Sequence, residues 1–246
     1  SLSFFAEKKK NLFIFFGIAF FLISLIIGER SNFLKVFIMY TIFFVFFIDI
    51  KFFKKFLLVF LMFAITLFVI NKNSHLKSKF KNHIFTQDLL ELFDKSDVNK
   101  NHLKDELDLK DVISENRHLS HYYIAFLIFK DNYLFGSGFK TFKIESFKER
   151  YFQEKNFHGA GNHPHQLHFE ILSELGIVGY MLIISNIFYI LFRKFKLNKN
   201  FLEKSSILFI VASLIPFLPS GSFFTTFGTT VFFINYSFLL KTNDIT

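Results

Sequence analysis

The chain has 246 residues, is 52% hydrophobic, and carries a mean hydropathy of +0.37 and a formal net charge of +9. This composition is too apolar for an ordinary soluble domain, and the apolar residues fall in blocks, so the sequence predicts an integral membrane protein. Since the chain contains no cysteine, disulfides, thiolate metal sites and a cysteine nucleophile are excluded.

Six apolar segments approach the roughly 20 residues that a helix needs to cross a hydrocarbon core. In chain order they are residues 11–27, 33–48, 52–70, 177–192, 201–218 and 222–240. The fifth fits least well, because it contains Glu203, Lys204 and Pro216. The first is not a cleaved signal peptide, since no small-residue cleavage site follows it and a second span comes almost at once. Because the chain starts with Ser1 and not with Met, we expect it to be the C-terminal part of a longer protein.

Basic clusters beside these segments predict the orientation of the chain. The clusters are Lys8 to Lys10, Lys51 with Lys54 and Lys55, and Arg193 and Lys194 with Lys196 and Lys199. Short cytoplasmic loops carry an excess of Lys and Arg, so an alternating count places these clusters inside and residues 71–175 on the outer face. We predict an all-α, polytopic membrane protein with about six spans. Residues 1–70 and 176–246 each hold three spans of one membrane domain, and residues 71–175 form a large outer loop with interfacial helices.

The outer loop is electrically balanced, since it holds fifteen Lys or Arg and fifteen Asp or Glu residues. The positive charge of the chain therefore lies in the parts that flank the membrane. A nucleic-acid partner needs a clustered basic face on a folded domain, and this loop has no such excess, so we exclude that partner. All nine histidines lie in the loop, which marks it as the segment where chemistry is expected.

Two helices are expected in the first part of the loop. Residues 84–93 form a short apolar patch that predicts an amphipathic helix. A second helix is predicted from about Arg117 through Phe129, and the turn at Gly136 and Gly138 follows it. This glycine pair does not meet the phosphate-loop or dinucleotide patterns, so it indicates a helix stop.

The end of the loop carries the most informative histidine, His165. Pro164 suits the first position of a helix, so we predict a helix from about Pro164 to Leu175, with His165 in its first turn. There the helix dipole disfavours the imidazolium and helps to keep the ring neutral. Gly176 is expected to be a hinge into the next span. His165 would then be a proton acceptor at the membrane surface.

Two alternative interpretations of the histidines are a metal site and a non-enzymatic role. His158, His163, His165 and His168 are close enough in sequence to ligate zinc. However, two of them flank a proline, and no acidic residue lies in a zinc-enzyme pattern, so we predict neither a metal nor a cofactor. A transporter or scaffold is the other alternative, but a transporter should place its polar groups in the middle of the membrane, where these spans have few.

Three short motifs occur in a fixed order on the predicted outer face. Their residues are Arg30 with Leu34, then Arg117 with Gly136 and Gly138, then His165 and Gln166 with Gly176 and Gly179. From about residue 11 to residue 192 the chain resembles the O-antigen ligase and polymerase superfamily of bacterial envelope glycosyltransferases. Those proteins show Arg, three residues and Leu on an outer turn, and an Arg that opens an outer helix. Their third motif is His followed by Asn, Ser or Gln, then nine residues, Gly, two residues, and finally Gly, Thr or Tyr.

The resemblance implies a GT-C-like enzyme of the bacterial inner membrane, with its active site facing the periplasm. It implies transfer of a polysaccharide from undecaprenyl diphosphate to a sugar hydroxyl of lipid A-core, without a metal. The alternative is the related polymerase, which joins lipid-linked repeat units.

The resemblance also assigns roles to individual residues. Arg30 and Arg117 are expected to hold the pyrophosphate, since guanidinium groups bind phosphate oxygens bidentately. His165 is expected to take the proton of the acceptor hydroxyl. The expected substrate-binding set also contains Gln166, His163 and His168. Glu170 and Glu174 are expected to orient arginines or cap the interface.

Overall fold

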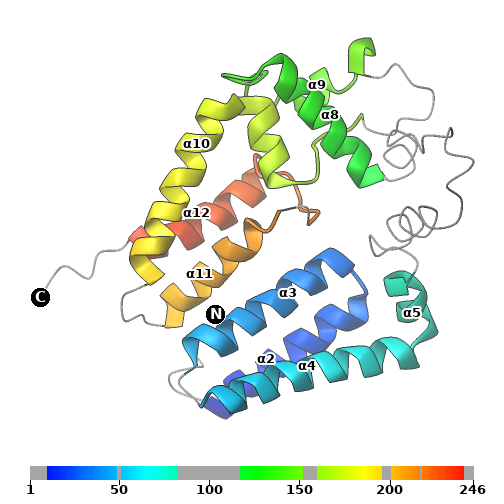
Figure 1. Ribbon diagram of the computed structural model, residues 1–246, viewed down its shortest axis with the longest axis vertical. Coiled ribbons are helices and arrows are strands. Elements are labelled where there is room, and N and C mark those ends of the chain that lie inside the picture. The colour runs from blue at the N-terminus through cyan, green and yellow to red at the C-terminus, as the bar shows by residue number, and fades with distance from the viewer. Residues whose placement is uncertain are drawn as a thin grey trace, which may run out of the picture. The chain divides into compact units, whose positions relative to one another are not determined.

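The computed structural model describes residues 10–48, 51–81, 117–151, 160–195, 201–216 and 218–240. Every regular element within these ranges is a helix, which confirms the predicted all-α membrane fold (Figure 1). The chain divides into two compact units, Ser1–Asp94 with Asn198–Ala212 and Lys95–Leu197 with Ser213–Thr246. The predicted helix at residues 84–93 and His158 lie outside the described residues.

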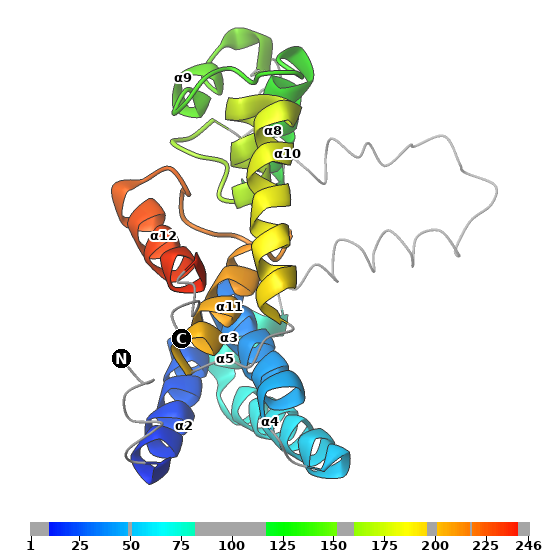
Figure 2. The same ribbon diagram turned by 90° about the vertical axis from the view of Figure 1, so that its left-hand side faces the viewer.

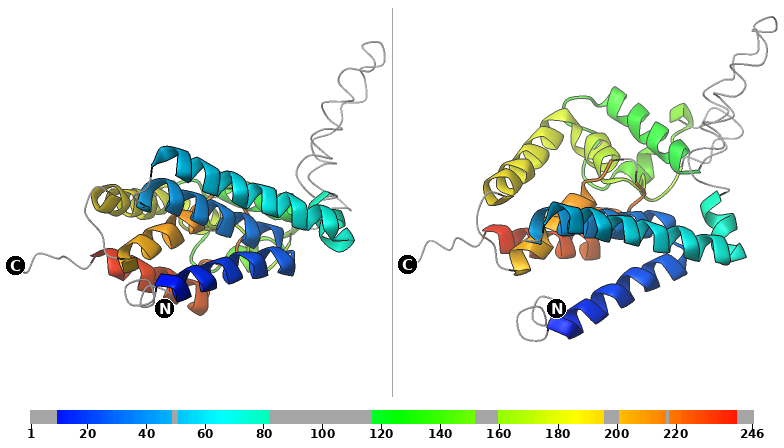
Figure 3. Two further views of the ribbon diagram at one scale, coloured as in Figure 1. Left: turned by 90° about the horizontal axis from the view of Figure 1, so that it is seen from below. Right: turned by 60° about the horizontal axis from the view of Figure 1, so that its bottom comes forward.

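The first unit contains three long helices and two shorter ones. They are α2 (Lys10–Ile27), α3 (Arg30–Ile42) with its π-helical continuation η1 (Phe43–Phe47), α4 (Phe52–Lys72), α5 (Ser74–Lys81) and α11 (Phe201–Ser213). Helices α2, α3 and α4, coloured blue to cyan in Figure 3, lie side by side. Their shared core is formed by Phe21, Leu25, Phe33 and Met62.

The turn between α2 and α3 is shorter than the sequence suggests. Gly28 has a φ of 70°, and Glu29 is the N-cap of α3, so Arg30 is the first residue of the helix and not part of the turn. The short helix α5 packs against this turn through Leu76, which is fully buried. Arg30 is therefore the first residue of α3 and follows a turn that α5 packs against.

The second unit is built around α10. Its helices are α8 (Arg117–Asp131), α9 (Phe142–Glu145), η2 (Glu149–Tyr151), α10 (Leu167–Phe195) and α12 (Thr226–Leu240). Gly176, with φ 67° and ψ −172°, breaks α10 into a first limb, residues 167–175, and a second limb, residues 177–195. Helix α8 packs on α10, and α12 runs alongside its second limb (Figures 1 and 2). The core beneath α8 is formed by Ile124, Ala125, Ile128, Phe142 and Tyr151.

Three helices of the described chain are long and apolar enough to cross a membrane. They are Arg30–Phe47, Phe52–Lys72 and Leu167–Phe195. Two shorter apolar helices, Phe15–Ile27 and Thr226–Leu240, coincide with the first and last predicted spans. Three of the six predicted spans thus coincide with helices long enough to cross a membrane, and α2 covers the whole of the first predicted span.

The fifth and sixth predicted spans are shorter than expected for local reasons. Helix α11 ends at Ser213 instead of residue 218, and Pro216, which has no backbone N–H to continue a helix, follows it. Helix α12 starts at Thr226 instead of residue 222, because the Thr225 hydroxyl accepts the backbone N–H of Gly228 at 3.1 Å as an N-cap.

Candidate functional site

The break in α10 is stabilised by the loop that follows α8. A broken helix leaves amide and carbonyl groups without their helical partners, and these groups need new ones when buried. Residues 133–138 form four backbone hydrogen bonds with the groups around the break. The bonds run from Ser137 N to Ser173 O (2.9 Å), from Gly138 N to Glu174 O (2.9 Å), from Ile177 N to Tyr133 O (2.9 Å) and from Val178 N to Leu134 O (3.2 Å). The predicted hinge at Gly176 is therefore a fixed bend.

Glycine is required on both sides of this bend. A Cβ atom on Gly136 would lie 2.3 Å from the Glu174 carbonyl carbon, and one on Gly176 would lie 2.4 Å from the Leu134 carbonyl oxygen. Both glycines also have positive φ angles, near 70°. The predicted helix stop is corrected here, since α8 already ends at Asp131 and Gly136 serves the close approach of two backbones.

Two buried carboxylates fasten further loops to the first limb. Glu174 accepts hydrogen bonds from the backbone N–H groups of Lys140 at 2.6 Å and Phe142 at 3.2 Å. Glu170 accepts from the Ser222 hydroxyl and from the backbone N–H of Phe223 at 2.7 Å. The expectation that these carboxylates cap the interface fits these contacts, and within the described chain neither contacts an arginine.

His165 lies in the loop before α10 and not in its first turn, so the predicted helix start at Pro164 is wrong. Helix α10 begins at Leu167, and Gln166 is its N-cap, because its side-chain oxygen accepts the backbone N–H of Phe169 at 3.0 Å. His165 has a φ of 57°, in the left-handed region. For a non-glycine residue that conformation costs about 1–2 kcal/mol. The backbone N–H of Ser220 donates to the His165 carbonyl at 2.7 Å and helps to hold it.

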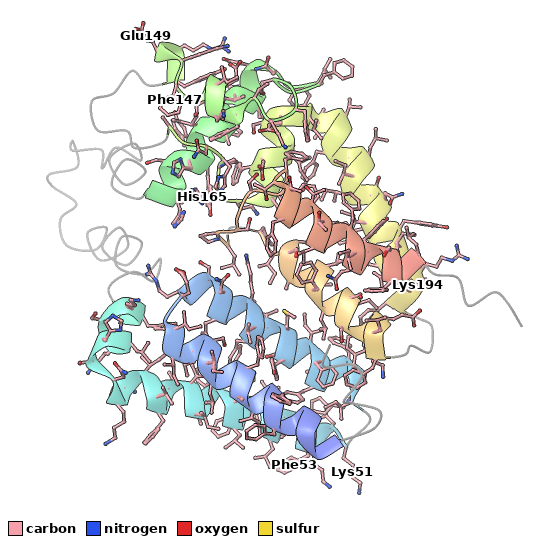
Figure 4. All side chains as sticks on the ribbon, turned by 180° about the vertical axis from the view of Figure 1, so that it is seen from behind. Lys51, Phe53, Phe147, Glu149, His165 and Lys194 are labelled. Atoms are coloured by element: carbon pink, nitrogen blue, oxygen red, sulfur yellow. The ribbon has the colours of Figure 1, made fainter. Side chains whose placement is uncertain are left out.

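Three other imidazoles surround the ring of His165. Its centroid lies 4.0 Å from that of His163, 5.1 Å from that of His121 and 5.5 Å from that of His118. His118 and His121 are one turn apart on α8, where His118 is exposed and His121 is buried. Figure 4 labels His165 beside this green helix. We call these four residues the imidazole cluster.

The surroundings of His163 favour the neutral form of its ring. Burial lowers the pKa of His163, and the electrostatic influence of the neighbouring His121 lowers it further. Searching the described residues reveals no group of three His, Asp or Glu side chains placed to hold a metal ion.

His168 and Gln166, both expected to bind substrate, are engaged inside the protein. The Nε2 atom of His168 lies 2.8 Å from the Leu214 carbonyl oxygen, and its Nδ1 atom lies 3.1 Å from the Tyr180 hydroxyl. Since a carbonyl only accepts, Nε2 carries the proton and Nδ1 accepts from Tyr180 in the neutral ring. Gln166 is only 1% exposed.

The two expected arginines are placed at the starts of helices. Arg30 begins α3 and is half-buried, and no hydrogen-bond or ion-pair partner for its guanidinium occurs in the described part of the chain. The Lys79 ammonium lies 3.6 Å from the position of a Cβ on Gly28, in the turn before Arg30. Arg117 begins α8, and its side chain lies outside the described residues. Arg30 belongs to the first unit, and His165 belongs to the second.

Of the expected site residues, the structure brings His163 and His165 together. The sequence interpretation missed His118 and His121 as their neighbours and Ser220 as the backbone donor to His165. One signal was available for the two histidines, since a spacing of three residues on a predicted helix places both on one face. Nothing in the sequence pointed to Ser220, which is 55 positions away from His165 in the chain.

Comparison with known proteins gives one match. The model of the family described as O-antigen ligase matches residues 12–184, which is most of the chain and includes all three motifs. No curated protein and no solved structure matches. The chain therefore belongs to the O-antigen ligase family.

Proposed function

We propose that this protein transfers a polysaccharide from undecaprenyl diphosphate to a sugar hydroxyl of lipid A-core, as an O-antigen ligase, on the periplasmic face of the bacterial inner membrane. The observation that carries the proposal is the placement of His165. His165 is half-buried, and its ring lies among the other three imidazoles of the cluster, on a left-handed residue that the Ser220 amide holds. Strain of this kind, maintained by surrounding bonds, is typical of functional positions.

In the proposed reaction the acceptor oxygen forms a bond to the anomeric carbon of the donor sugar. The bond from that carbon to the diphosphate oxygen breaks, and its electron pair leaves with the diphosphate. The hydroxyl proton passes to a neutral nitrogen of His165, which makes the oxygen a better nucleophile. Exposed His118, beside His165, offers the proton a route to water.

Three of the other described histidines, His121, His163 and His168, are less suited to be the base. His121 is the buried member of the imidazole cluster, and both ring nitrogens of His168 are engaged in the protein. His163 contacts His165 directly, so we assign it to support of that ring and to contact with the acceptor sugar.

Arg30 and Arg117 are proposed to bind the diphosphate. The guanidinium of Arg30 is half-buried, and within the described residues it has no acidic partner, so it is available to an anion. Lys79 adds positive charge at the same corner. Arg117 starts the helix that carries His118 and His121, which supports a place beside the cluster. If planar bidentate binding of the diphosphate is needed, Arg30→Lys abolishes transfer although the positive charge remains. Full activity of this variant would show that Arg30 serves only the orientation of the chain in the membrane.

The test is the lipopolysaccharide pattern of the source organism with the complete gene deleted. The same strain is complemented with wild type, with His165→Ala, and with Asn162→Ala as a control for an exposed residue of the same loop. Core lipid without repeats, with glycan left on the lipid carrier, supports the ligase, provided that only His165→Ala fails to restore attachment. Core that carries a single repeat would instead identify the polymerase.

A further inference from the structure

The loop between α8 and α9 exposes large apolar side chains. Tyr133, Leu134, Phe135 and Phe139 are 53%, 55%, 74% and 59% exposed, and we call them the outer apolar patch. Each square ångström of apolar surface left in water costs about 25 cal/mol, so large apolar side chains exposed together on one loop indicate a contact surface.

Backbone hydrogen bonds fix the level of this patch along the membrane span. Tyr133 and Leu134 accept hydrogen bonds from Ile177 and Val178, which are the first residues of the second limb of α10. That limb is the apolar part of a helix long enough to cross the membrane. The patch therefore lies at the level where the apolar second limb begins.

A second apolar helix begins at the same place. The Phe139 ring meets the ring of Phe224 edge-on, with centroids 4.8 Å apart, and Phe224 lies two residues before α12. Phe227, in the first turn of α12, is 80% exposed. The patch is thus continuous with the starts of two apolar helices, which is the position of an interfacial belt and not of a water-facing loop.

The charge beside the patch also fits a lipid surface. The Lys140 ammonium lies 5.3 Å from the centre of the Phe139 ring and belongs to an exposed side chain. An exposed lysine beside an interfacial aromatic ring can extend its ammonium to lipid phosphates while the ring enters the acyl region.

We propose that the outer apolar patch inserts into the outer leaflet of the bilayer and anchors the second unit there. The same loop supplies the bonds that hold the bend of α10, so insertion fixes the height of the first limb and of His165 above the lipid. A catalytic loop held at constant height suits substrates that are themselves carried on lipids. The anchor does not depend on which sugar transfer the protein performs.

The absence of tryptophan allows a direct test. Phe135→Trp is made in the full chain, reconstituted in vesicles of lipids brominated either just below the headgroup or near the chain end. Phe188→Trp, exposed on the second limb, is the matched control within the span, and Glu149→Trp, exposed on η2, is the matched control in water. Fluorescence quenching is recorded for each variant, with acrylamide as the aqueous quencher.

We expect the shallow bromine to quench Phe135→Trp severalfold more than Glu149→Trp. The deep bromine should quench Phe135→Trp less than the shallow bromine does, and Phe135→Trp should be protected from acrylamide. Phe188→Trp should be quenched by both lipids. The proposal is overturned if Phe135→Trp is quenched by acrylamide as strongly as Glu149→Trp. It is also overturned if this tryptophan is shielded from acrylamide but insensitive to both brominated lipids, because a protein surface would then cover the patch.

Discussion

The two ends of the first limb of α10 are held in different ways. At its C-terminal end, four backbone hydrogen bonds fasten the bend, and glycines at positions 136 and 176 leave no room for a methyl group. At its N-terminal end, the Gln166 side chain caps the helix, Glu170 holds a distant turn, and a single backbone bond reaches His165.

This difference separates the parts of one motif by function. Gly176 of the His-Gln motif forms a bend that any side chain would disturb, whereas the histidine of the motif presents its side chain from a loop. Substitutions at the bend should therefore lower stability, and substitutions in the His165 loop should lower transfer in a folded protein.

The largest effect is expected at the histidine end. His165→Ala should reduce the rate of transfer by about 10²–10⁴-fold, the usual contribution of a general base, because no proton acceptor remains at that position. The measurement is transfer from lipid-linked donor to acceptor with purified protein, alongside thermal unfolding in detergent. Asn162→Ala serves as the control. Transfer at the wild-type rate by a folded mutant would remove His165 from the mechanism.

At the glycine end, Gly176→Ala should lower the free energy of unfolding by more than about 2 kcal/mol. The left-handed conformation alone costs about 1–2 kcal/mol for alanine, and the new Cβ would lie 2.4 Å from a carbonyl oxygen. Thermal unfolding in detergent measures the loss. Gly17→Ala, in a regular helix with its Cβ no closer than 3.4 Å to Tyr40, should not destabilise the protein. Equal melting temperatures for both variants would show that the bend can relax.

The helices could be predicted from sequence because apolar runs and flanking charges decide them locally. The kink at Gly176 was also predictable, since glycine near a change from polar to apolar sequence marks a helix end. The C-terminus of α11 and the N-terminus of α12 were not predicted. The first depends on Pro216 at the end of an apolar segment, and the second depends on the cap by the Thr225 side chain.

The site was predictable only in part. His165 could be identified from motif spacing, but its left-handed backbone could not, because that conformation depends on the cap by Gln166 and on the distant Ser220 amide. His118 and His121 join the site through packing of α8 on α10, and no local pattern encodes that packing.

A smaller loss of stability is expected from Glu174→Gln. Both carboxylate oxygens accept backbone N–H groups, from Lys140 and Phe142, whereas glutamine offers one oxygen and a donor. One buried N–H then loses its acceptor, which costs about 1–3 kcal/mol. Chemical unfolding of the detergent-solubilised protein tests this, with exposed Glu149→Gln expected to change stability by less than about 0.5 kcal/mol. A fall in transfer without a fall in stability would make Glu174 part of the chemistry and weaken the division between the two ends.

Gly161→Ala tests the division with a backbone-sized change at the histidine end. The new Cβ would lie 2.8 Å from the Cε1 atom of His121, a buried ring that packs against His165 at 5.1 Å. Because the ring has to shift within the cluster, we expect about a tenfold loss of transfer, equivalent to about 1.4 kcal/mol in the barrier. Gly221→Ala is the matched control, since nothing lies within 4 Å of its Cβ position, and it should be silent. If Gly161→Ala instead lowers the melting temperature and leaves transfer by the folded protein unchanged, the loop is architectural at this end as well, and the two ends of the limb no longer differ in kind.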